Sequence, residues 1–230
     1  PEAAAGAVVV RITMANVCGS DLHIWRGTYD VSKGHSEPFC LSIGHEMTGV
    51  VHELGEGVTS DSALMRFPLG ARLSYNKVAI GFGLARSALD VFVDLAEGKV
   101  PRFSSRSLRE RPAAQQAIAK AEVRLRSSRA LVMELVGEMW QKVQDGKEIS
   151  LKEKAIFHIA CSDAVRAAAE SVDRVCEAAG TSANFKGHPL ERIARDVKVI
   201  RQHVTVASHH IEDGGRVLLG LPANGMMLRS

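Results

Sequence analysis

The chain has few aromatic residues and few cysteines, and it has no long hydrophobic run. Aromatic side chains make up 5% of the 230 residues, and there are four cysteines. These are Cys18, Cys40, Cys161 and Cys176, which form no C-x-x-C pair and no spacing typical of a disulfide framework. No apolar stretch approaches the roughly 20 residues that a membrane-spanning helix needs. We therefore expect reduced thiols in a cytoplasmic protein with no membrane partner.

The chain also lacks a strong net charge. Its formal charge of +3 is too small to indicate nucleic-acid binding. Residues 1–77 carry 6 Lys and Arg against 8 Asp and Glu, a net −2, whereas residues 78–230 carry 23 against 18, a net +5. Apolar residues make up 46% of the chain, which is enough to build a core. The uneven charge is a mild indication of two regions with different character.

The first 76 residues have the pattern of a small β-rich unit. Residues 7–15 are rich in β-branched side chains, and residues 47–54 repeat that texture, so both are expected to be strands. Residues 28–40 contain Gly, Ser, Asp and Pro and are expected to form a loop.

From Val78 onward the pattern becomes helical. We expect a first helix over residues 78–98, a basic loop over 99–111, and a long helix over 112–144 with an apolar residue every seven positions. Ser150 and Glu153 have the spacing of a capping box, which should open a helix that ends near Gly180. A fourth helix should run over residues 189–209, before Gly214-Gly215 breaks the pattern.

These four helices and their short connections predict the fold class. It is mainly α, a C-terminal up-and-down helical bundle preceded by a small β-rich region. Cys161, Cys176, Trp140 and Phe157 are expected in the core or at an interface of that bundle.

The N-terminal region holds residue types that suit a catalytic zinc. Cys18 and His45 supply a thiolate and an imidazole, Ser20 could hydrogen-bond a zinc-bound alcohol, and His23 could pass its proton to solvent. The stretch Cys18-Gly19-Ser20-Asp21-Leu22-His23, followed by Gly44-His45-Glu46, resembles the GroES-like catalytic domain of zinc-dependent medium-chain alcohol dehydrogenases. The resemblance implies that Cys18 and His45 bind zinc and that Glu46 is a carboxylate close to the metal.

The dehydrogenase resemblance stops near Asn76. No G-x-G-x-x-G follows it, and the third protein ligand that the family draws from later residues is missing, so water would fill the remaining zinc positions. Cys40 and His35 could in principle complete the site. We therefore expect zinc at low occupancy, in the remnant of a dehydrogenase.

The C-terminal region resembles the helical C-terminal domain of the acyl-CoA dehydrogenase superfamily. The stretches that carry the resemblance are Gly83-Leu84-Ala85-Arg86-Ser87-Ala88-Leu89-Asp90, Arg109-Glu110-Arg111-Pro112-Ala113-Ala114-Gln115, Glu177-Ala178-Ala179-Gly180-Thr181-Ser182 and Pro189-Leu190-Glu191-Arg192-Ile193-Ala194-Arg195-Asp196. It implies a flavin, FMN or FAD, bound between domains and completed by a neighbouring subunit. Lys99 and Arg102 could face a flavin phosphate, although a charged loop is usually solvated.

One replacement favours the monooxygenase branch of that superfamily. True acyl-CoA dehydrogenases carry a catalytic Glu a few residues after Arg-Asp, but this chain has Arg201-Gln202-His203-Val204-Thr205 there. In flavin-dependent monooxygenases, reduced flavin reacts with oxygen, and an imidazole can hydrogen-bond the resulting peroxide or act as a general base on a phenol. His203 is the candidate for that role, and the alternative is a histidine satisfied within the bundle.

Neighbouring residues have plainer interpretations. His209 and His210 should face solvent, and Arg195-Asp196 should be a structural ion pair or helix contact.

Three hypotheses follow. The chain is a flavin-dependent oxidoreductase or monooxygenase relative that is catalytically incomplete on its own, a zinc-dehydrogenase remnant, or a non-catalytic helical oligomerisation module that arose as a gene-fusion product or an engineered joining. The resemblance implies a homo-oligomer through the bundle and, in relatives, a flavin reductase as partner.

Overall fold

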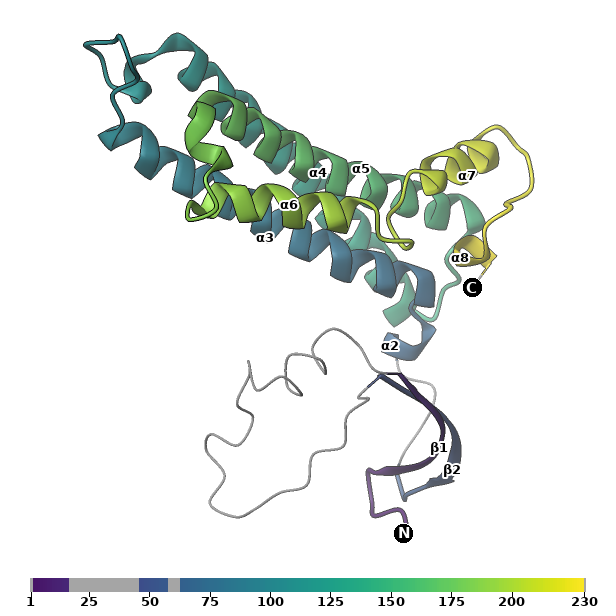
Figure 1. Cartoon of the computed structure of the whole chain (residues 1–230). Coiled ribbons are helices and arrows are strands. Elements are labelled where there is room, and N and C mark those ends of the chain that lie inside the picture. Colours follow the sequence, from purple (N-terminus) through teal and green to yellow (C-terminus); the bar gives the residue numbers. More distant parts are fainter. Residues whose placement is uncertain (1, 17–45, 58–62, 230) are drawn as a thin grey trace, which may run out of the picture. The chain divides into compact units, whose positions relative to one another are not determined.

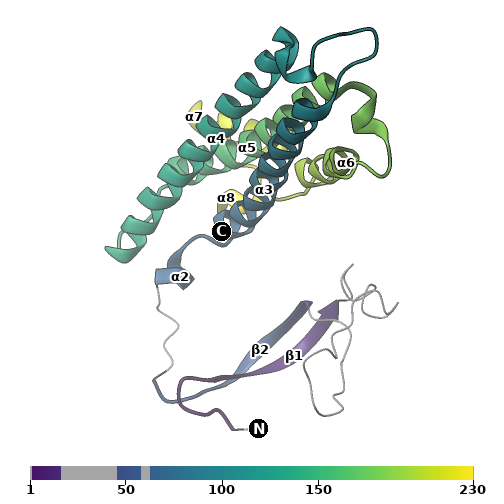
Figure 2. The same ribbon diagram turned by 90° about the vertical axis from the view of Figure 1, so that its left-hand side faces the viewer.

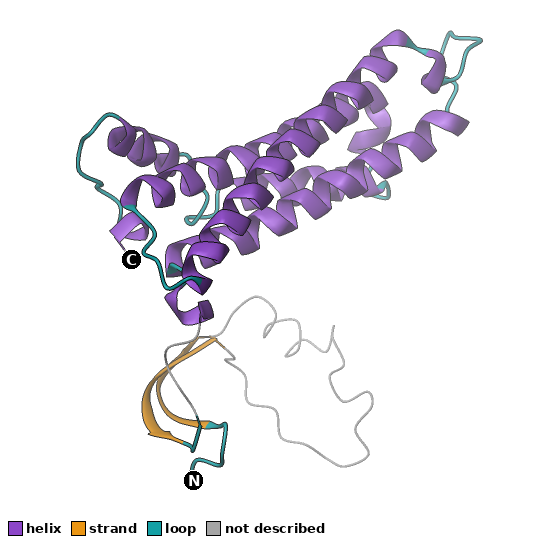
Figure 3. Cartoon of the chain, turned by 180° about the vertical axis from the view of Figure 1, so that it is seen from behind, coloured by secondary structure: helices purple, strands orange, loops and turns teal. Residues whose placement is uncertain are grey.

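The structure is a computed structural model that describes residues 2–16, 46–57 and 63–229. The chain divides into two compact units, Pro1–Asp61 and Ser62–Ser230. The larger unit is helical and the smaller one contains a two-stranded sheet, as Figure 3 shows. The predicted fold class is confirmed.

The sheet of the smaller unit pairs β1 (Val8–Asn16) with β2 (Glu46–Leu54) in antiparallel fashion. The pairing runs from Val8 opposite Leu54 to Asn16 opposite Glu46, with register shifts after Val9 and Ile12. Both strands lie where the β-branched pattern predicted them. The apolar side chains that are described in these strands, among them Val8, Val10 and Val50, are largely exposed, because two strands alone bury little surface.

The larger unit is built from long helices that lie side by side (Figures 1 and 2). Helix α4 spans the 33 residues that the heptad pattern predicted, and its core face includes Ala121, Leu125, Val132 and Met139. In chain order the elements are α2 (Ala63–Arg66), α3 (Leu69–Gly98), η1 (Leu108–Glu110), α4 (Pro112–Gln144), α5 (Leu151–Ala179), η2 (Gly180–Asn184), α6 (Pro189–Arg201), α7 (His209–Leu218) and α8 (Met226–Arg229).

Helix α5 lies at the centre of the bundle. It contacts α3, α4, α6 and α7, and 15 of its 29 residues are buried. Seven of the fifteen are alanines, so neighbouring helices approach closely, while Phe157 provides bulk and is fully buried. Phe157 confirms the core prediction. Trp140 is 36% exposed and packs against Phe67 instead of entering the core.

The turn between α4 and α5 is closed by a capping box. Ser150 and Glu153 exchange hydrogen bonds, as their spacing predicted, and Lys142 at the end of α4 forms an ion pair with Glu153. The hydrogen bond from Lys142, followed by those from Ser150, lowers the pKa of Glu153 to about 2. The carboxylate therefore ties the end of one helix to the start of the next.

Three predicted boundaries were wrong. Helix α3 begins at Leu69 instead of Val78, because Ala71, Ser74 and Val78 continue its buried face back to Pro68. Helix α6 ends at Arg201 instead of near His209. Gly214-Gly215 lies inside α7, where a side chain at Gly214 would meet Ile159 Cγ1 at 2.5 Å, so the glycine permits close packing on α5.

The two cysteines of the described helices are free thiols, in keeping with the reduced state that their spacing predicted. Cys161 is buried, and burial raises the pKa of the half-buried Cys176 thiol to about 11. Cys18 and Cys40 lie outside the described residues. Within the described helices, none is long and apolar enough to cross a membrane.

Truncating Phe157 tests the central role of α5. We expect Phe157→Ala to lower the free energy of unfolding by about 3–5 kcal/mol, because a large cavity would open among alanines that cannot collapse into it. Urea denaturation followed by circular dichroism measures the change. Val123→Ala on the exposed face of α4 is the control and should stay within about 0.5 kcal/mol of the parent. Equal losses in both variants would contradict this account of the core.

Candidate functional site

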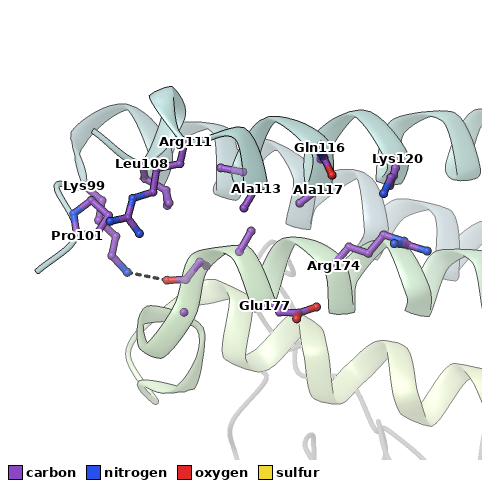
Figure 4. Close-up of a pocket in the computed structure, with 14 residues that line it drawn as sticks. Lys99, Pro101, Leu108, Arg111, Ala113, Gln116, Ala117, Lys120, Arg174 and Glu177 are labelled. Atoms are coloured by element: carbon purple, nitrogen blue, oxygen red, sulfur yellow. Dashed lines mark hydrogen bonds between the residues drawn. The ribbon is translucent and has the colours of Figure 1, made fainter. Parts of the chain in front are cut away.

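An open pocket of about 540 Å³ lies where α3 ends, α4 begins and α5 ends (Figure 4). Its walls come from three segments, namely the 99–111 connection, the first turns of α4 and the last turns of α5. They comprise Lys99, Pro101, Leu108, Arg111, Ala113, Ala114, Gln116, Ala117, Lys120, Arg174, Glu177, Ala178, Ala179 and Gly180.

The pocket is positively charged, with four cationic side chains against one carboxylate. Lys99 is already engaged, because its Nζ donates to Ala179 O at 2.6 Å and to Ser182 Oγ at 2.8 Å and so caps the end of α5. Arg111, Lys120 and Arg174 have no ion-pair partner among the residues that the structure describes. Three cations therefore remain available to an anionic ligand.

Alanines form the apolar part of this pocket. Ala113 and Ala117 project from α4 and face α5, as Figure 4 shows, and Ala178 and Ala179 belong to the last turn of α5. Gly180 ends α5 with φ +63°, a conformation that favours glycine. A flat apolar wall beside three cations suits a ligand that combines a planar ring system with phosphate.

The basic loop beside the pocket places Arg102 away from its walls. The guanidinium carbon of Arg102 lies 4.9 Å from the ring centre of Phe103, a cation–π distance. Phe103 is 96% exposed and has φ 62°, so a bulky residue occupies the left-handed region in full contact with solvent. Arg102 as a flavin-phosphate ligand stays a prediction.

His203 lies in the turn that follows α6. The Thr205 amide donates to His203 Nδ1 at 3.3 Å, and Thr205 Oγ1 is 3.0 Å from the same atom. Because an amide can only donate, Nδ1 accepts, and the proton of the neutral ring lies on Nε2. Burial, and to a lesser degree the charge of Lys77, lowers the pKa of His203. The ring is therefore prepared to donate a hydrogen bond from Nε2.

Three helices hold this turn in place. Ser74 Oγ of α3 donates to Thr205 O at 2.8 Å, His210 Nε2 of α7 bonds Val204 O at 2.8 Å, and Ser162 Oγ of α5 bonds Ala207 O at 3.3 Å. The expectation for His210 was wrong, because this residue is 2% exposed and satisfied by Val204, whereas His209 is exposed as predicted.

A cluster of buried polar side chains, which includes His158 and Asp213, lies beside the Ser74 and His210 that form these hydrogen bonds. Ser74 Oγ lies 3.2 Å from His158 Nδ1, and the His158 and His210 rings are 5.3 Å apart. Asp213 of α7 accepts from the Asn224 and Gly225 amides at 2.6 and 2.9 Å. Burial first, then the charge of His210, lowers the pKa of His158 to about 4. His158 is therefore neutral near pH 7.

Arg195 and Asp196 do not pair with each other. Arg195 pairs with Glu191 and Asp196 with Arg192, each within α6. The expected ion pair between Arg195 and Asp196 was therefore wrong, and each residue instead forms an ion pair with another residue of the same helix.

His203 and the cationic pocket are separate within one chain. Lys99 contacts Ser182 just before α6, and His203 follows its last turn. A 13-residue helix is ~20 Å long. One small group cannot touch both from within the same subunit.

The predicted zinc residues fall on a part of the chain for which no side chains are described. Cys18, Ser20, His23 and His45 lie outside the described residues, and Glu46 opens β2 without a described side chain. Among the side chains that are described, no cluster of three or more His, Cys, Asp or Glu could hold a metal. The zinc site stays a prediction.

Comparison with known families accounts for both parts of the chain. Residues 76–208, more than half of the chain, match the model of the acyl-CoA dehydrogenase C-terminal domain. The chain belongs to the acyl-CoA dehydrogenase family. Residues 4–74 match the alcohol dehydrogenase GroES-like domain. Both resemblances that the sequence suggested are thereby confirmed.

Individual relatives of the acyl-CoA dehydrogenase domain are monooxygenases. The chain is 28% identical over 160 residues to indole-3-acetate monooxygenase of Pseudomonas putida, an alignment that covers 70% of this chain and 41% of that protein. The solved structure of XiaF from Streptomyces sp. in complex with FADH2 and glycerol shares the fold, with a TM-score of 0.69 at 15% identity over 80% of this chain and 50% of that one.

The N-terminal part has relatives of a different kind. It is 36% identical over 86 residues to an alcohol dehydrogenase of Cupriavidus necator, which covers 37% of this chain and 22% of that protein. The chain spans less than half the length of each of these curated relatives.

The pocket cations were largely missed by sequence reasoning. Arg111 was noted only as part of a family motif, and Lys120, Arg174 and Phe103 were not singled out. Lys120 and Arg174 lie on different helices, so no short-range spacing connects them. The aromatic residue inside an Arg- and Ser-rich loop was the one local signal that could have drawn attention to Phe103.

Acid should weaken the cluster below the His203 turn. Between pH 6.5 and about 4, His158 binds a proton in the unfolded chain but stays neutral in the folded protein, where it is buried. The free energy of unfolding should therefore fall as the pH falls through this window. The lowered pKa of His210 acts in the same direction. We expect His158→Gln to flatten the dependence, measured by urea denaturation at a series of pH values. His52→Gln, at an exposed site of the smaller unit, should leave it unchanged, and an unaltered slope in the His158 variant would refute the assignment.

Proposed function

We propose that this chain is a flavin-binding relative of acyl-CoA dehydrogenase-type monooxygenases and that the 540 Å³ pocket holds the phosphate end of the flavin. The observation that carries the proposal is the set of three unpaired cations, Arg111, Lys120 and Arg174, beside an alanine wall. Arginine and lysine bind phosphate oxygens through charge-assisted hydrogen bonds. The flavin bound in the solved relative XiaF supports the same ligand class.

The loop beside the pocket contributes a second kind of contact. Phe103 offers an exposed aromatic face, and Arg102 lies over the same ring. We propose that Phe103 packs against a ring of the flavin and that Arg102 approaches its phosphate. Phe103 is 96% exposed, so a ligand can reach its ring.

His203 serves the reacting end of the site in this proposal. A bound reduced flavin would supply the electrons for oxygen chemistry. His203 would donate a hydrogen bond from Nε2, because Nδ1 is held by Thr205. Since His203 and the pocket are ~20 Å apart along α6, a second copy of the chain would have to complete each site. We therefore propose a homo-oligomer formed through the bundle, with a flavin reductase as the electron source.

Removing pocket cations should weaken flavin binding. We expect Lys120→Gln and Arg174→Gln each to raise the Kd of FMN or FAD by on the order of tenfold, because each loses a charge-assisted hydrogen bond to phosphate. Quenching of flavin fluorescence on titration with protein measures the affinity. Arg129→Gln, also on α4 but outside the pocket, is the matched control.

The same titration separates the proposal from its alternative. Failure of the parent chain to bind either flavin would reject flavin binding. A stable oligomer in light scattering, together with that failure, would favour a non-catalytic helical oligomerisation module.

A zinc-dehydrogenase remnant is a second candidate, favoured by the match over residues 4–74. In this reading residues 1–76 and 78–230 are two domains of different ancestry. Cys18 and His45 would bind the metal beside Glu46, and Ser20 and His23 would relay a proton.

We expect less than one zinc per chain, because two protein ligands leave the other positions to water. Elemental analysis of the purified chain checks this, with Cys18→Ser as the control that should lose what metal there is. Full occupancy in the parent would show that further residues complete the site, and equal zinc in both chains would show that Cys18 is no ligand.

A further inference from the structure

Two further hollows lie at the start of α3, the end of the helix away from Lys99. One is a cavity of about 520 Å³ between the start of α3 and the α4–α5 turn. The other is a groove of about 380 Å³ between the start of α3 and the end of α4. Helix α3 has 30 residues and so is ~45 Å long. Both hollows are therefore remote from the Lys99 pocket at its other end.

The cavity is cationic. Four of its lining residues are positively charged, against the single carboxylate of Glu148, and they are Arg66, Arg72, Lys147 and Lys154. Lys147 pairs with Asp145 at 3.0 Å, and Arg66 donates to Val143 O at 3.2 Å. These contacts fix the rim of the cavity.

The groove is apolar and aromatic. Leu64, Phe67, Val136 and Trp140 line it together with Tyr75, and the Phe67 and Trp140 rings are 6.2 Å apart. Leu64 is 56% exposed, although it has a large apolar side chain. An apolar ligand would remove this surface from water.

Arg72 joins the two hollows, since it lines both of them. Its Nε is buried, with no hydrogen-bond partner in the described part of the chain. A buried donor without an acceptor is costly. The terminal nitrogens of the same half-buried guanidinium also form no hydrogen bond or ion pair in the described part of the chain, and an anion in the cavity would accept from them.

The start of α3 adds to the same local charge. Pro68 and Leu69 line the cavity, and the N-cap residue Pro68 gives the first turn no side-chain acceptor. The first amides of a 30-residue helix carry partial positive charge. Together with the unsatisfied Arg72, this makes the junction of the two hollows a place for one negative group.

We propose that this junction binds a small carboxylate with an apolar tail, aromatic or aliphatic. The carboxylate accepts from Arg72 beside the first turn of α3, and the tail lies in the groove against Phe67 and Trp140. The site is independent of the flavin pocket and does not rest on the proposed flavin function.

Trp140 provides a direct readout. The chain has two tryptophans, so Trp25→Phe leaves Trp140 as the only one. Titration with 4-phenylbutyrate should change its emission saturably, whereas the neutral 4-phenylbutanamide should bind on the order of tenfold more weakly. Calorimetry on the unsubstituted chain gives the same comparison without any variant.

Arg72→Gln tests the anchoring residue. The variant should bind 4-phenylbutyrate only as weakly as the parent binds the amide, and its affinity for the amide should equal that of the parent. Arg129→Gln should change neither affinity. Flavin affinity should be the same in the parent and in Arg72→Gln, so failure here and failure of the flavin proposal are distinguishable.

Three outcomes would overturn the proposal. They are equal affinity of acid and amide for the parent chain, full retention of acid binding in a folded Arg72→Gln, and no saturable binding of the acid. Competition by inorganic phosphate as strong as that by 4-phenylbutyrate would overturn the role of the groove. Because the acid–amide comparison uses the parent chain, it decides the matter even if the Arg72 variant fails to fold.

Discussion

The close packing around α5 is the constraint on which the rest of the helical unit depends. Its alanines pack against α3, where a side chain at Gly81 would be in ordinary van der Waals contact, 3.6 Å from Ala168 and Val165. At Gly214 the approach of α7 is closer still. Because the helices cannot separate or rotate without opening voids, the last turns of α5 help to place the cationic pocket, and Ser162 near its middle helps to place the turn that carries His203.

Local sequence signals predicted those elements whose determinants are local. The capping box at Ser150 and the β-branched strand segments gave the right elements because caps and strand propensity act within a few residues. The start of α3 was not predictable in this way, since residues 69–77 are helical through burial against α5. The end of α6 depends on Ser74, which binds the following turn from a distant part of the chain, and on His210 of the next helix.

The residues of the candidate site also divide into those with a local sequence signal and those that only the fold brings together. His203 could be proposed because it follows the Arg195-Asp196 motif in one continuous stretch, and Arg102 because it lies in a basic loop. Lys120 and Arg174 come to line the same pocket only when α4 packs on α5, and nothing in the sequence around either residue indicates this. The burial of His210 was missed for a related reason: a His-His pair after a helix looks solvated until the carbonyl of Val204 is found beside it.

Phe103 is exposed and its backbone is in the left-handed region, which makes the connection between α3 and α4 a site for proteolytic cleavage. The loop around it is anchored by Lys99 at the end of α5 and by the buried Leu108, while Arg102 and Phe103 themselves are exposed. Helix α3, by contrast, is held to α5 and α6. A protease that cleaves after aromatic residues would meet its bond between Phe103 and Ser104 there. The helices on either side would stay associated after the cut. The association of the two fragments would then measure the free energy of helix packing without the covalent connection.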